Sequence, residues 1–213
     1  MDDVWYILGT SKDINNIDGK WFNGKSIIAM NGSYEIAAKY GRQVDEWICH
    51  DQCFMFFKEI VHNSIPAFRK WVLYDYAVDE RLQRFRPNRT NYERWKDHNV
   101  WFYTVRTSRT NLPELKPHIA KSPSDNLTIL DNYIYTIFTA TSLAVGLGAK
   151  EIRYRGVELG GSHFNDKKKC NLDHHYGEQS MKFKKFIIPA CVEMGIKLIN
   201  ETPNARHNIN TPS

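Results

Sequence analysis

The sequence contains few cysteines and no long uninterrupted hydrophobic segment. Only four of its 213 residues are cysteines, whereas small secreted domains that depend on disulfides carry them densely. We therefore expect free thiols in a reducing compartment, the cytoplasm. The longest apolar stretch, residues 129–148, includes an Asp-Asn pair and several threonines, so it predicts a buried helix and not a membrane span. The acidic start, Met1-Asp2-Asp3, does not resemble a secretory signal.

The sequence also lacks a strong charge of one sign, an internal repeat and a low-complexity segment. Its formal net charge is +5 and its pI is near 8.9, which suits a phosphorylated partner without requiring one. A hydrophobic fraction of 42% and an aromatic fraction of 13% exclude a disordered chain. A chain of this length buries one substantial core, so we expect a single domain over residues 1–213. The oligomeric state stays open, and a homo-oligomer is compatible with the sequence.

What the sequence does contain is an alternation of short apolar runs with helix-like segments. Runs rich in β-branched and aromatic residues that end at small or polar residues predict strands. The expected strands are residues 4–8, 26–30, 47–50, 72–76, 100–105, 151–154 and 196–200. The expected helices are residues 33–40 with Ser33 as cap, 53–61 with Asp51 as cap, an apolar helix that ends near Gly146, and residues 180–194. This alternation predicts an α/β, Rossmann-like fold, a mostly parallel sheet with helices on both faces.

Two long segments interrupt the alternation. Residues 79–98 interleave arginines with aromatic residues and are broken by Pro87-Asn88. This composition suits a surface for phosphates or single-stranded nucleic acid, a lid over a negatively charged donor, or an ordinary charged surface with aromatic residues beneath it. We expect a basic, lid-like insertion, whose candidate acceptor-binding or phosphate-binding residues are Arg84, Arg86 and Arg89. Residues 106–126 form a second irregular connection, long enough to be a functional loop.

Small or polar residues follow four of the predicted strands. They are Gly9-Thr10-Ser11, Asn31-Gly32, His50-Asp51 and residues 156–163. In a parallel sheet these ends share one edge, at which ligands of α/β proteins bind. Small residues let a ligand approach backbone N–H groups, and helix N-termini favour a phosphate. We therefore predict a phosphate-binding crevice, with residues 142–161, a helix end followed by a strand and a glycine-rich exit, as one wall.

The order of these motifs resembles two related protein families. An apolar strand then Gly-x-Ser, a second strand then Asn, the segment LGAKEIRYRGVEL at residues 147–159 and the segment INETPN at residues 199–204 are similar to the family 42 bacterial sialyltransferases. Those enzymes use a cytidine-monophosphate sugar. The pattern is also similar to the family of the archaeal 6-hydroxymethylpterin diphosphokinase, which includes many phage-type proteins. The similarity covers most of the chain except the basic insertion.

The resemblance implies a set of residues that contact the donor nucleotide. Thr136 matches only part of the Thr-Ser-Gly motif at the start of the families' central helix, and Glu158 stands where the families have Asp. The implied nucleotide or donor contacts are Gly9, Thr10, Ser11, Asn31, Asp51, Thr136, Gly156, Glu158, Gly160, Thr202 and Asn204.

The chain departs from the sialyltransferases at the catalytic positions. Gly160 and His163 stand where that family has two tyrosines that bind the leaving phosphate. Its general-base histidine lies in a His-Tyr-x-Gly-His stretch, whereas residues 174–178 here read HHYGE. We expect His175 or Glu178 to deprotonate an acceptor hydroxyl, and protonated His163 to stabilise the departing phosphate. The alternative is that all three are solvated loop residues.

Two sets of residues have side chains that metals accept. Cys49-x-x-x-Cys53 and the Cys-x-x-x-His segment at 170–174 match zinc ligands. The first pair lies among apolar neighbours, so we expect buried free thiols and no metal. Asp51 and Glu158 would hold Mg²⁺ if the substrate were ATP, as the pterin-kinase resemblance implies. The sialyltransferase resemblance requires no metal, and no cofactor is firmly expected.

The sequence thus predicts a glycosyltransferase-like enzyme that transfers a sugar from a nucleotide-activated donor to a hydroxyl acceptor. The acceptor would be a surface glycan or a hydroxylated base in phage-type DNA. The first alternative is a Mg-ATP-dependent pterin pyrophosphokinase-like enzyme. The second is a non-catalytic nucleic-acid-binding module, which would bind through the arginine segment in a strongly salt-dependent way.

Overall fold

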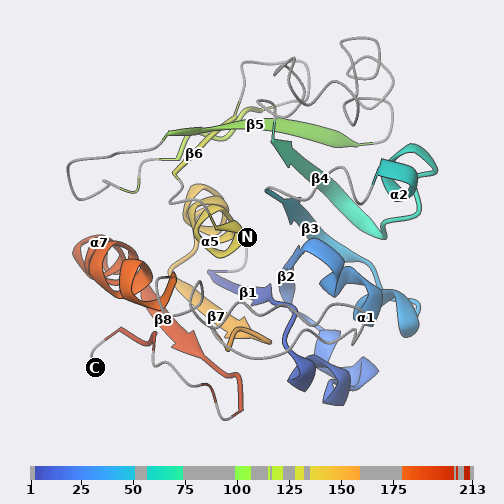
Figure 1. Cartoon of the computed structure of the whole chain (residues 1–213), viewed down its shortest axis with the longest axis horizontal. Coiled ribbons are helices and arrows are strands. Elements are labelled where there is room, and N and C mark those ends of the chain that lie inside the picture. The colour runs from blue at the N-terminus through green and yellow to red at the C-terminus, as the bar shows by residue number, and fades with distance from the viewer. Residues whose placement is uncertain are drawn as a thin grey trace.

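The computed structural model contains one parallel β-sheet with helices packed against it (Figure 1). It describes residues 3–50, 57–73, 99–106, 115, 117–121, 128–131, 135–158, 179–203, 205 and 209–211. Eight strands lie in the order β6-β5-β4-β3-β2-β1-β7-β8, and every neighbouring pair is parallel. The strands are β1 Val4–Leu8, β2 Ser26–Met30, β3 Val44–Cys49, β4 Ala67–Leu73, β5 Val100–Arg106, β6 Thr128–Asp131, β7 Glu151–Arg155 and β8 Lys197–Asn200. The predicted Rossmann-like parallel sheet is confirmed.

Among the described residues, the longest element that is α-helical throughout is α5 Thr136–Gly146. The 3-10 turns are η1 Lys12–Asn16, η2 Gly19–Phe22 and η3 Asn31–Ser33. The helices are α1 Tyr34–Lys39, α2 Phe57–Val61, α5 Thr136–Gly146 and α7 Ile188–Glu193, the last preceded by the π-helical turn η7 Phe183–Ile187.

The sheet separates two hydrophobic cores. On one face α5 and α7 pack over β-strand side chains such as Ile7, Ile48 and Tyr154, which are fully buried. On the other face α1, α2 and the 3-10 turns pack over side chains such as Leu8 and Trp47. In Figure 1 α5 and α7 lie on one side of the sheet, while α1 and α2 lie on the other. Helices therefore occur on both faces, as predicted.

Strand β4 begins five residues earlier than predicted, because two charged side chains concealed it. Arg69 reaches the buried carboxylate of Glu46 on β3, and its Nε lies 2.8 Å from Glu46 Oε1. Lys70 is only 2% exposed, and its Nζ donates to Asn63 Oδ1 at 2.8 Å. Charged residues inside a strand are compatible with burial when each has a partner. The prediction of a strand start at residue 72 was therefore wrong.

Two further predictions near helix starts were wrong. Residues 129–131, which we assigned to the apolar helix, belong to the edge strand β6, and the helix itself begins only at Thr136. Ser33 precedes α1 but makes no capping hydrogen bond. Its hydroxyl donates instead to the carbonyl of Leu8, at 2.8 Å. The Ser33 hydroxyl therefore bonds a residue of β1 in place of the first N–H groups of α1.

Candidate functional site

The strand order places a topological switch point at the carboxyl ends of β1 and β7. From β1 the chain adds β2 to β6 on one side of the sheet and then returns to add β7 and β8 on the other. Connections from β1 and β7 thus leave in opposite directions, and ligands of α/β proteins bind in the crevice beyond such a point (Figure 1). The residues that follow β1, β2 and β7 are those for which we predicted donor contacts.

Gly9 and Gly156 bring the ends of β1 and β7 into close contact. Gly9 N–H donates to the carbonyl of Arg155 at 2.7 Å, and Ser11 N–H donates to that of Gly156 at 3.0 Å. A Cβ on Gly9 would lie 2.7 Å from the carbonyl carbon of Gly156, and Gly156 itself has φ +74°. Both positions therefore require glycine. The N–H groups of Gly9 and Ser11 are therefore bound within the fold, by the carbonyls of Arg155 and Gly156. The donor contacts expected at these residues stay a prediction.

The end of β2 joins this junction through Asn31 and Ser33. Asn31 has φ +50°, and its carbonyl accepts a hydrogen bond from Trp47 Nε1 at 2.7 Å. The Ser33 hydroxyl donates to the last residue of β1. Asn31 Oδ1 is shielded from solvent and has no hydrogen-bond partner among the described residues. An unpaired buried acceptor is costly, which marks Asn31 as a candidate ligand contact.

Thr202 closes the junction from the side of β8. Its Oγ1 accepts a hydrogen bond from Val157 N–H at 2.9 Å. The side chain of Asn200 donates to the Val157 carbonyl at 3.1 Å and accepts from Thr202 N–H at 3.1 Å. Thr202 therefore holds the exit of β7. Asn200, which we had not singled out, does so as well.

Ser11, Asp13 and Arg155 set the charge beside this exit. The Ser11 hydroxyl donates to Asp13 Oδ1. Arg155 Nε lies 3.3 Å from Asp13 Oδ2, and Arg155 Nη1 donates to the Glu201 carbonyl at 2.8 Å. The hydroxyl proton of Ser11 is thus bound by a protein carboxylate. The charges of Arg155 and Asp13 neutralise each other in an ion pair.

The start of α5 supplies the helix N-terminus that we expected at this edge. Thr136 is its first residue, and the preceding Tyr135 provides no side-chain cap. Because α5 follows β6 and leads into β7 in a parallel sheet, its N-terminus lies at the carboxyl edge. The first N–H groups of a helix have no partner within it, and its dipole favours an anion there. Thr136 therefore lies at a position suited to a phosphate.

His50 is a candidate whose environment the sequence did not reveal. It follows β3, is 7% exposed, and its Nδ1 lies 3.3 Å from the hydroxyl of Tyr103 on β5. That hydroxyl donates its only proton to the carbonyl of Cys49, at 3.0 Å. Tyr103 can then only accept from His50, so the imidazole carries its proton on Nδ1 and its lone pair on Nε2. Burial lowers the pKa of His50 to about 4, which keeps the ring neutral.

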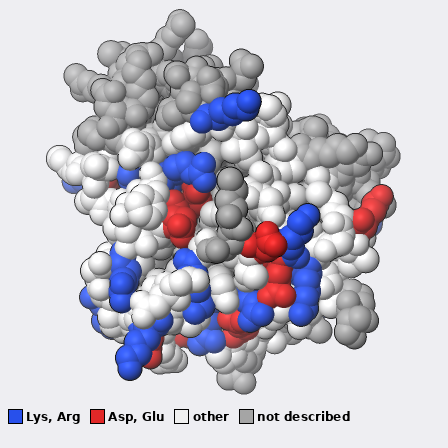
Figure 2. Space-filling model, turned by 180° about the vertical axis from the view of Figure 1, so that it is seen from behind, with Lys and Arg blue, Asp and Glu red and all other residues white. Residues whose placement is uncertain are grey.

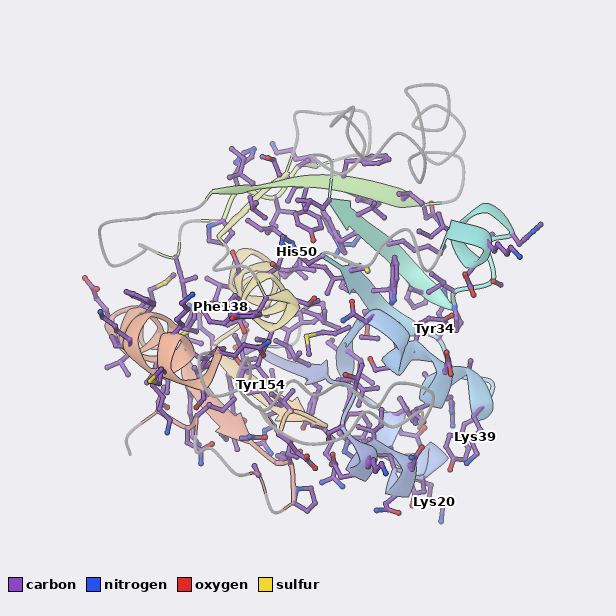
Figure 3. All side chains as sticks on the ribbon, viewed as in Figure 1. Lys20, Tyr34, Lys39, His50, Phe138 and Tyr154 are labelled. Carbon is purple, nitrogen blue, oxygen red and sulfur yellow. The ribbon has the colours of Figure 1, made fainter. Side chains whose placement is uncertain are left out.

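Figure 3 shows His50 near the carboxyl end of β3 and beside α5, while Lys20 and Lys39 lie at the periphery. Helix α5 packs against β1, β2 and β3. His50 and the Asn31 junction therefore share the edge of the sheet at which α5 begins.

Several predicted residues lie outside the described part of the chain. They include the candidates for proton transfer and leaving-group stabilisation, the arginines of the basic insertion, and three implied donor contacts. These residues are His163, His175, Glu178, Arg84, Arg86, Arg89, Asp51, Gly160 and Asn204. The remaining implied contacts lie at one edge of the sheet, because they follow neighbouring strands or begin α5. They are Gly9, Thr10, Ser11, Asn31, Thr136, Gly156, Glu158 and Thr202.

The described residues contain no cluster of three or more His, Cys, Asp or Glu side chains arranged to hold a metal ion. Cys49 and Cys191 are buried free thiols. Within the ranges given above, no helix is both long and apolar enough to cross a membrane.

Comparison with known proteins found no matching family model and no matching curated protein. Among solved structures, the chain is similar to the sialyltransferase CstII from Campylobacter jejuni in complex with a substrate analogue, CMP-3FNeuAc. The two are 12% identical with a TM-score of 0.49, over 98% of this chain and 88% of that one. A structure of the sialyltransferase CST-II with a trisaccharide acceptor and CMP gives 14% identity and a TM-score of 0.49, over 99% and 88%. Likeness of this size carries no argument about function, which rests on the residues of this chain.

Proposed function

We propose that this protein is a glycosyltransferase-like enzyme that transfers a sugar from a nucleotide-activated donor to a hydroxyl group. The observation that carries the proposal is Asn31 Oδ1, a buried acceptor without a described partner at the carboxyl end of β2, the strand next to the switch point. A buried acceptor is satisfied by an O–H or N–H group of a ligand. Ribose hydroxyls and the amino groups of bases are such donors, and they belong to a nucleotide.

A second feature of the same edge suits the phosphate of the donor. The N-terminus of α5, at Thr136, has no side-chain cap and favours a negative charge. A nucleotide combines hydrogen-bond donors on its nucleoside with a phosphate, so one molecule satisfies both features. The leaving group of a nucleotide sugar is this phosphate, which His163 would stabilise while His175 or Glu178 accepts the proton of the acceptor hydroxyl.

The sequence resembles families that use either donor, and we propose the sugar donor, which the nucleotide screen below separates from ATP. The strand followed by Gly-x-Ser, the Asn after the second strand and the segment at residues 199–204 are similar to enzymes that use cytidine-monophosphate sugars. For the acceptor we propose a glycan hydroxyl. Among the described residues on the face shown in Figure 2, basic and acidic side chains lie interspersed. A DNA acceptor would therefore depend on the arginine segment at residues 79–98.

The proposal is tested by a nucleotide screen with a matched pair of variants. Cytidine, uridine, guanosine and adenosine monophosphates, and ATP with Mg²⁺, are titrated by calorimetry. The preferred nucleotide is then offered as its sugar conjugates, with glycan acceptors, and transfer is followed by mass spectrometry. Asn31→Gly keeps the positive φ but removes the amide, and we expect about tenfold weaker nucleotide binding, the value of one hydrogen bond.

Asn99→Gly is the control, because Asn99 also has a positive φ, +57°, but precedes β5 at the opposite edge of the sheet. It should bind the nucleotide like the parent. Binding of ATP that requires Mg²⁺, without a response to any monophosphate, would replace the proposal with the pyrophosphokinase alternative. Salt-dependent DNA binding without nucleotide binding would favour the nucleic-acid module.

A further inference from the structure

The outer edge of β8 is covered by residues 209–211, which we call the strap. Figure 1 shows the chain near β8, and hydrogen bonds join residues 209–211 to this strand. Leu198 N–H donates to Thr211 Oγ1 at 3.2 Å, and Thr211 N–H donates back to the Leu198 carbonyl at 3.2 Å. Two positions further along, Asn200 N–H donates to Asn210 Oδ1 at 2.6 Å. The strap thus satisfies an exposed sheet edge mainly through side-chain oxygens.

One apolar side chain anchors the strap. Ile209 is fully buried and belongs to the core on the α5 and α7 side of the sheet, together with Leu198. Burying a side chain of this size stabilises by about 1.5–3 kcal/mol. The strap is therefore docked, with its polar residues hydrogen-bonded along β8.

Asn200 connects the strap to the switch point. Its backbone N–H is bound by Asn210, while its side chain bonds the Val157 carbonyl and Thr202 N–H. Thr202 in turn accepts from Val157 N–H. A continuous series of hydrogen bonds therefore runs from Asn210 through Asn200 to the exit of β7, directly after Gly156.

We propose that Asn210 is a positioning residue for the donor site and acts through Asn200. With Asn210 in place, the backbone of Asn200 is fixed on its outer edge. Its side chain then holds the Val157 carbonyl directly and holds the Val157 N–H through Thr202. Without that bond, β8 frays from its carboxyl end, which is the end that contacts the site. The effect on ligand affinity rests on the proposed function, whereas the effect on the β7 exit does not.

The first experiment measures amide hydrogen exchange by NMR without ligand, for the parent and three variants. Asn210→Ala removes the acceptor, Asn210→Asp keeps Oδ1, and Thr211→Val removes the neighbouring bond to Leu198. We expect Asn210→Ala to speed exchange at Asn200 and Val157 by about 2- to 10-fold, as for the loss of one net hydrogen bond. Asn210→Asp should restore protection at both amides, and Thr211→Val should speed exchange at Leu198 alone.

The amide of Ile7 in the core serves as the reference for global unfolding. Faster exchange at Val157 relative to Ile7 in Asn210→Ala supports the positioning role. Unchanged exchange at Val157, or an equal rise at Ile7 and Val157, overturns it, since the strap would then be inert or merely stabilising.

The second experiment measures the affinity for cytidine monophosphate in the same proteins. We expect Asn210→Ala to weaken binding about 2- to 10-fold, and to raise KM for a donor without changing kcat, while Asn210→Asp and Thr211→Val bind like the parent. Failure of the parent to bind any nucleotide counts against the proposed function, and the exchange result then decides the positioning role alone. Equal affinity of the parent and Asn210→Ala, despite altered exchange, overturns the link between strap and site.

Discussion

The backbone of Gly9 lies so close to that of Gly156 that Gly9 has no room for a side chain: a Cβ there would stand 2.7 Å from the carbonyl carbon of Gly156 and 2.7 Å from Val157 Cγ2. The obstacle at Gly9 includes backbone, which cannot turn aside. We predict that Gly9→Ala separates the ends of β1 and β7 and lowers the free energy of unfolding by about 1–3 kcal/mol, measured by urea denaturation.

Gly19→Ala is the matched control for this prediction. Gly19 also has an ordinary φ, but a Cβ there would meet the ring of Tyr40 at 3.1 Å, and that exposed side chain can shift. A small effect at both positions would show that the junction of β1 and β7 is not tightly packed.

The neutral imidazole of His50 predicts a defined pH dependence of stability. In the unfolded chain this group binds a proton near its ordinary pKa of 6.5, whereas in the fold its pKa is about 4 because of burial. The unfolded state therefore binds more protons between these values, and stability falls as the pH is lowered through this window. The contribution is at most about 3 kcal/mol. NMR titration of His50 checks the pKa, and His50→Gln should flatten the fall in stability between pH 6.5 and pH 4.

The fixed tautomer of His50 predicts different outcomes for two conservative variants. Asn places its amide near the position of Nδ1 and can keep the contact with Tyr103, whereas Gln extends to the position of Nε2. If Nε2 accepts a hydrogen bond from the nucleotide, His50→Gln should retain affinity and His50→Asn should bind about tenfold more weakly. Calorimetry with cytidine and uridine monophosphates and their 2′-deoxy forms measures this. Better binding by the Asn variant would show that His50 acts only through Tyr103.

The ion pair of Arg69 and Glu46 predicts an asymmetry between its two partners. Glu46 is 2% exposed, and burial raises the pKa of its carboxyl even though Arg69 and Trp71 donate to it. Removing Arg69 leaves a buried carboxylate unpaired. The Arg69 side chain is 31% exposed, so breaking this pair costs less than breaking a fully buried one. We expect Arg69→Met to lower the free energy of unfolding by about 2–3 kcal/mol. Glu46→Gln, which keeps an acceptor for Trp71, should lose less in the same urea titration.

Sequence pattern predicted the parallel sheet and the convergence of its strand ends because both depend on local signals. Gly9, Asn31 and Gly156 each follow a short buried run, and parallel pairing brings such ends to one edge. The pattern did not predict that β4 starts at Ala67, because Arg69 and Lys70 look solvated until Glu46 and Asn63 are placed beside them. The start of β4 therefore depends on hydrogen bonds to residues that are distant in sequence.

The same limit applies to the chemistry of the site. No local signal shows that the N–H groups of Gly9 and Ser11 are taken by β7, or that the Tyr103 hydroxyl fixes the tautomer of His50. Residues 209–211 look like a tail, because Ile209 and Asn210 acquire their roles only against β8. The sequence predicts the location of the site at one edge of the sheet. Which groups of the site donate or accept hydrogen bonds depends on contacts between strands.

The residues proposed for catalysis give the last prediction. If His175 or Glu178 is the general base, His175→Ala or Glu178→Gln should lower kcat about 100-fold or more, while nucleotide affinity stays at the parent value because the base does not hold the donor. His163→Ala should lower kcat as well, by weakening the stabilisation of the departing phosphate. The two roles differ in one readout: a donor with a more acidic leaving group restores the rate of His163→Ala but not that of the base variant. Equal turnover of His163→Ala and the parent would remove His163 from the leaving-group role.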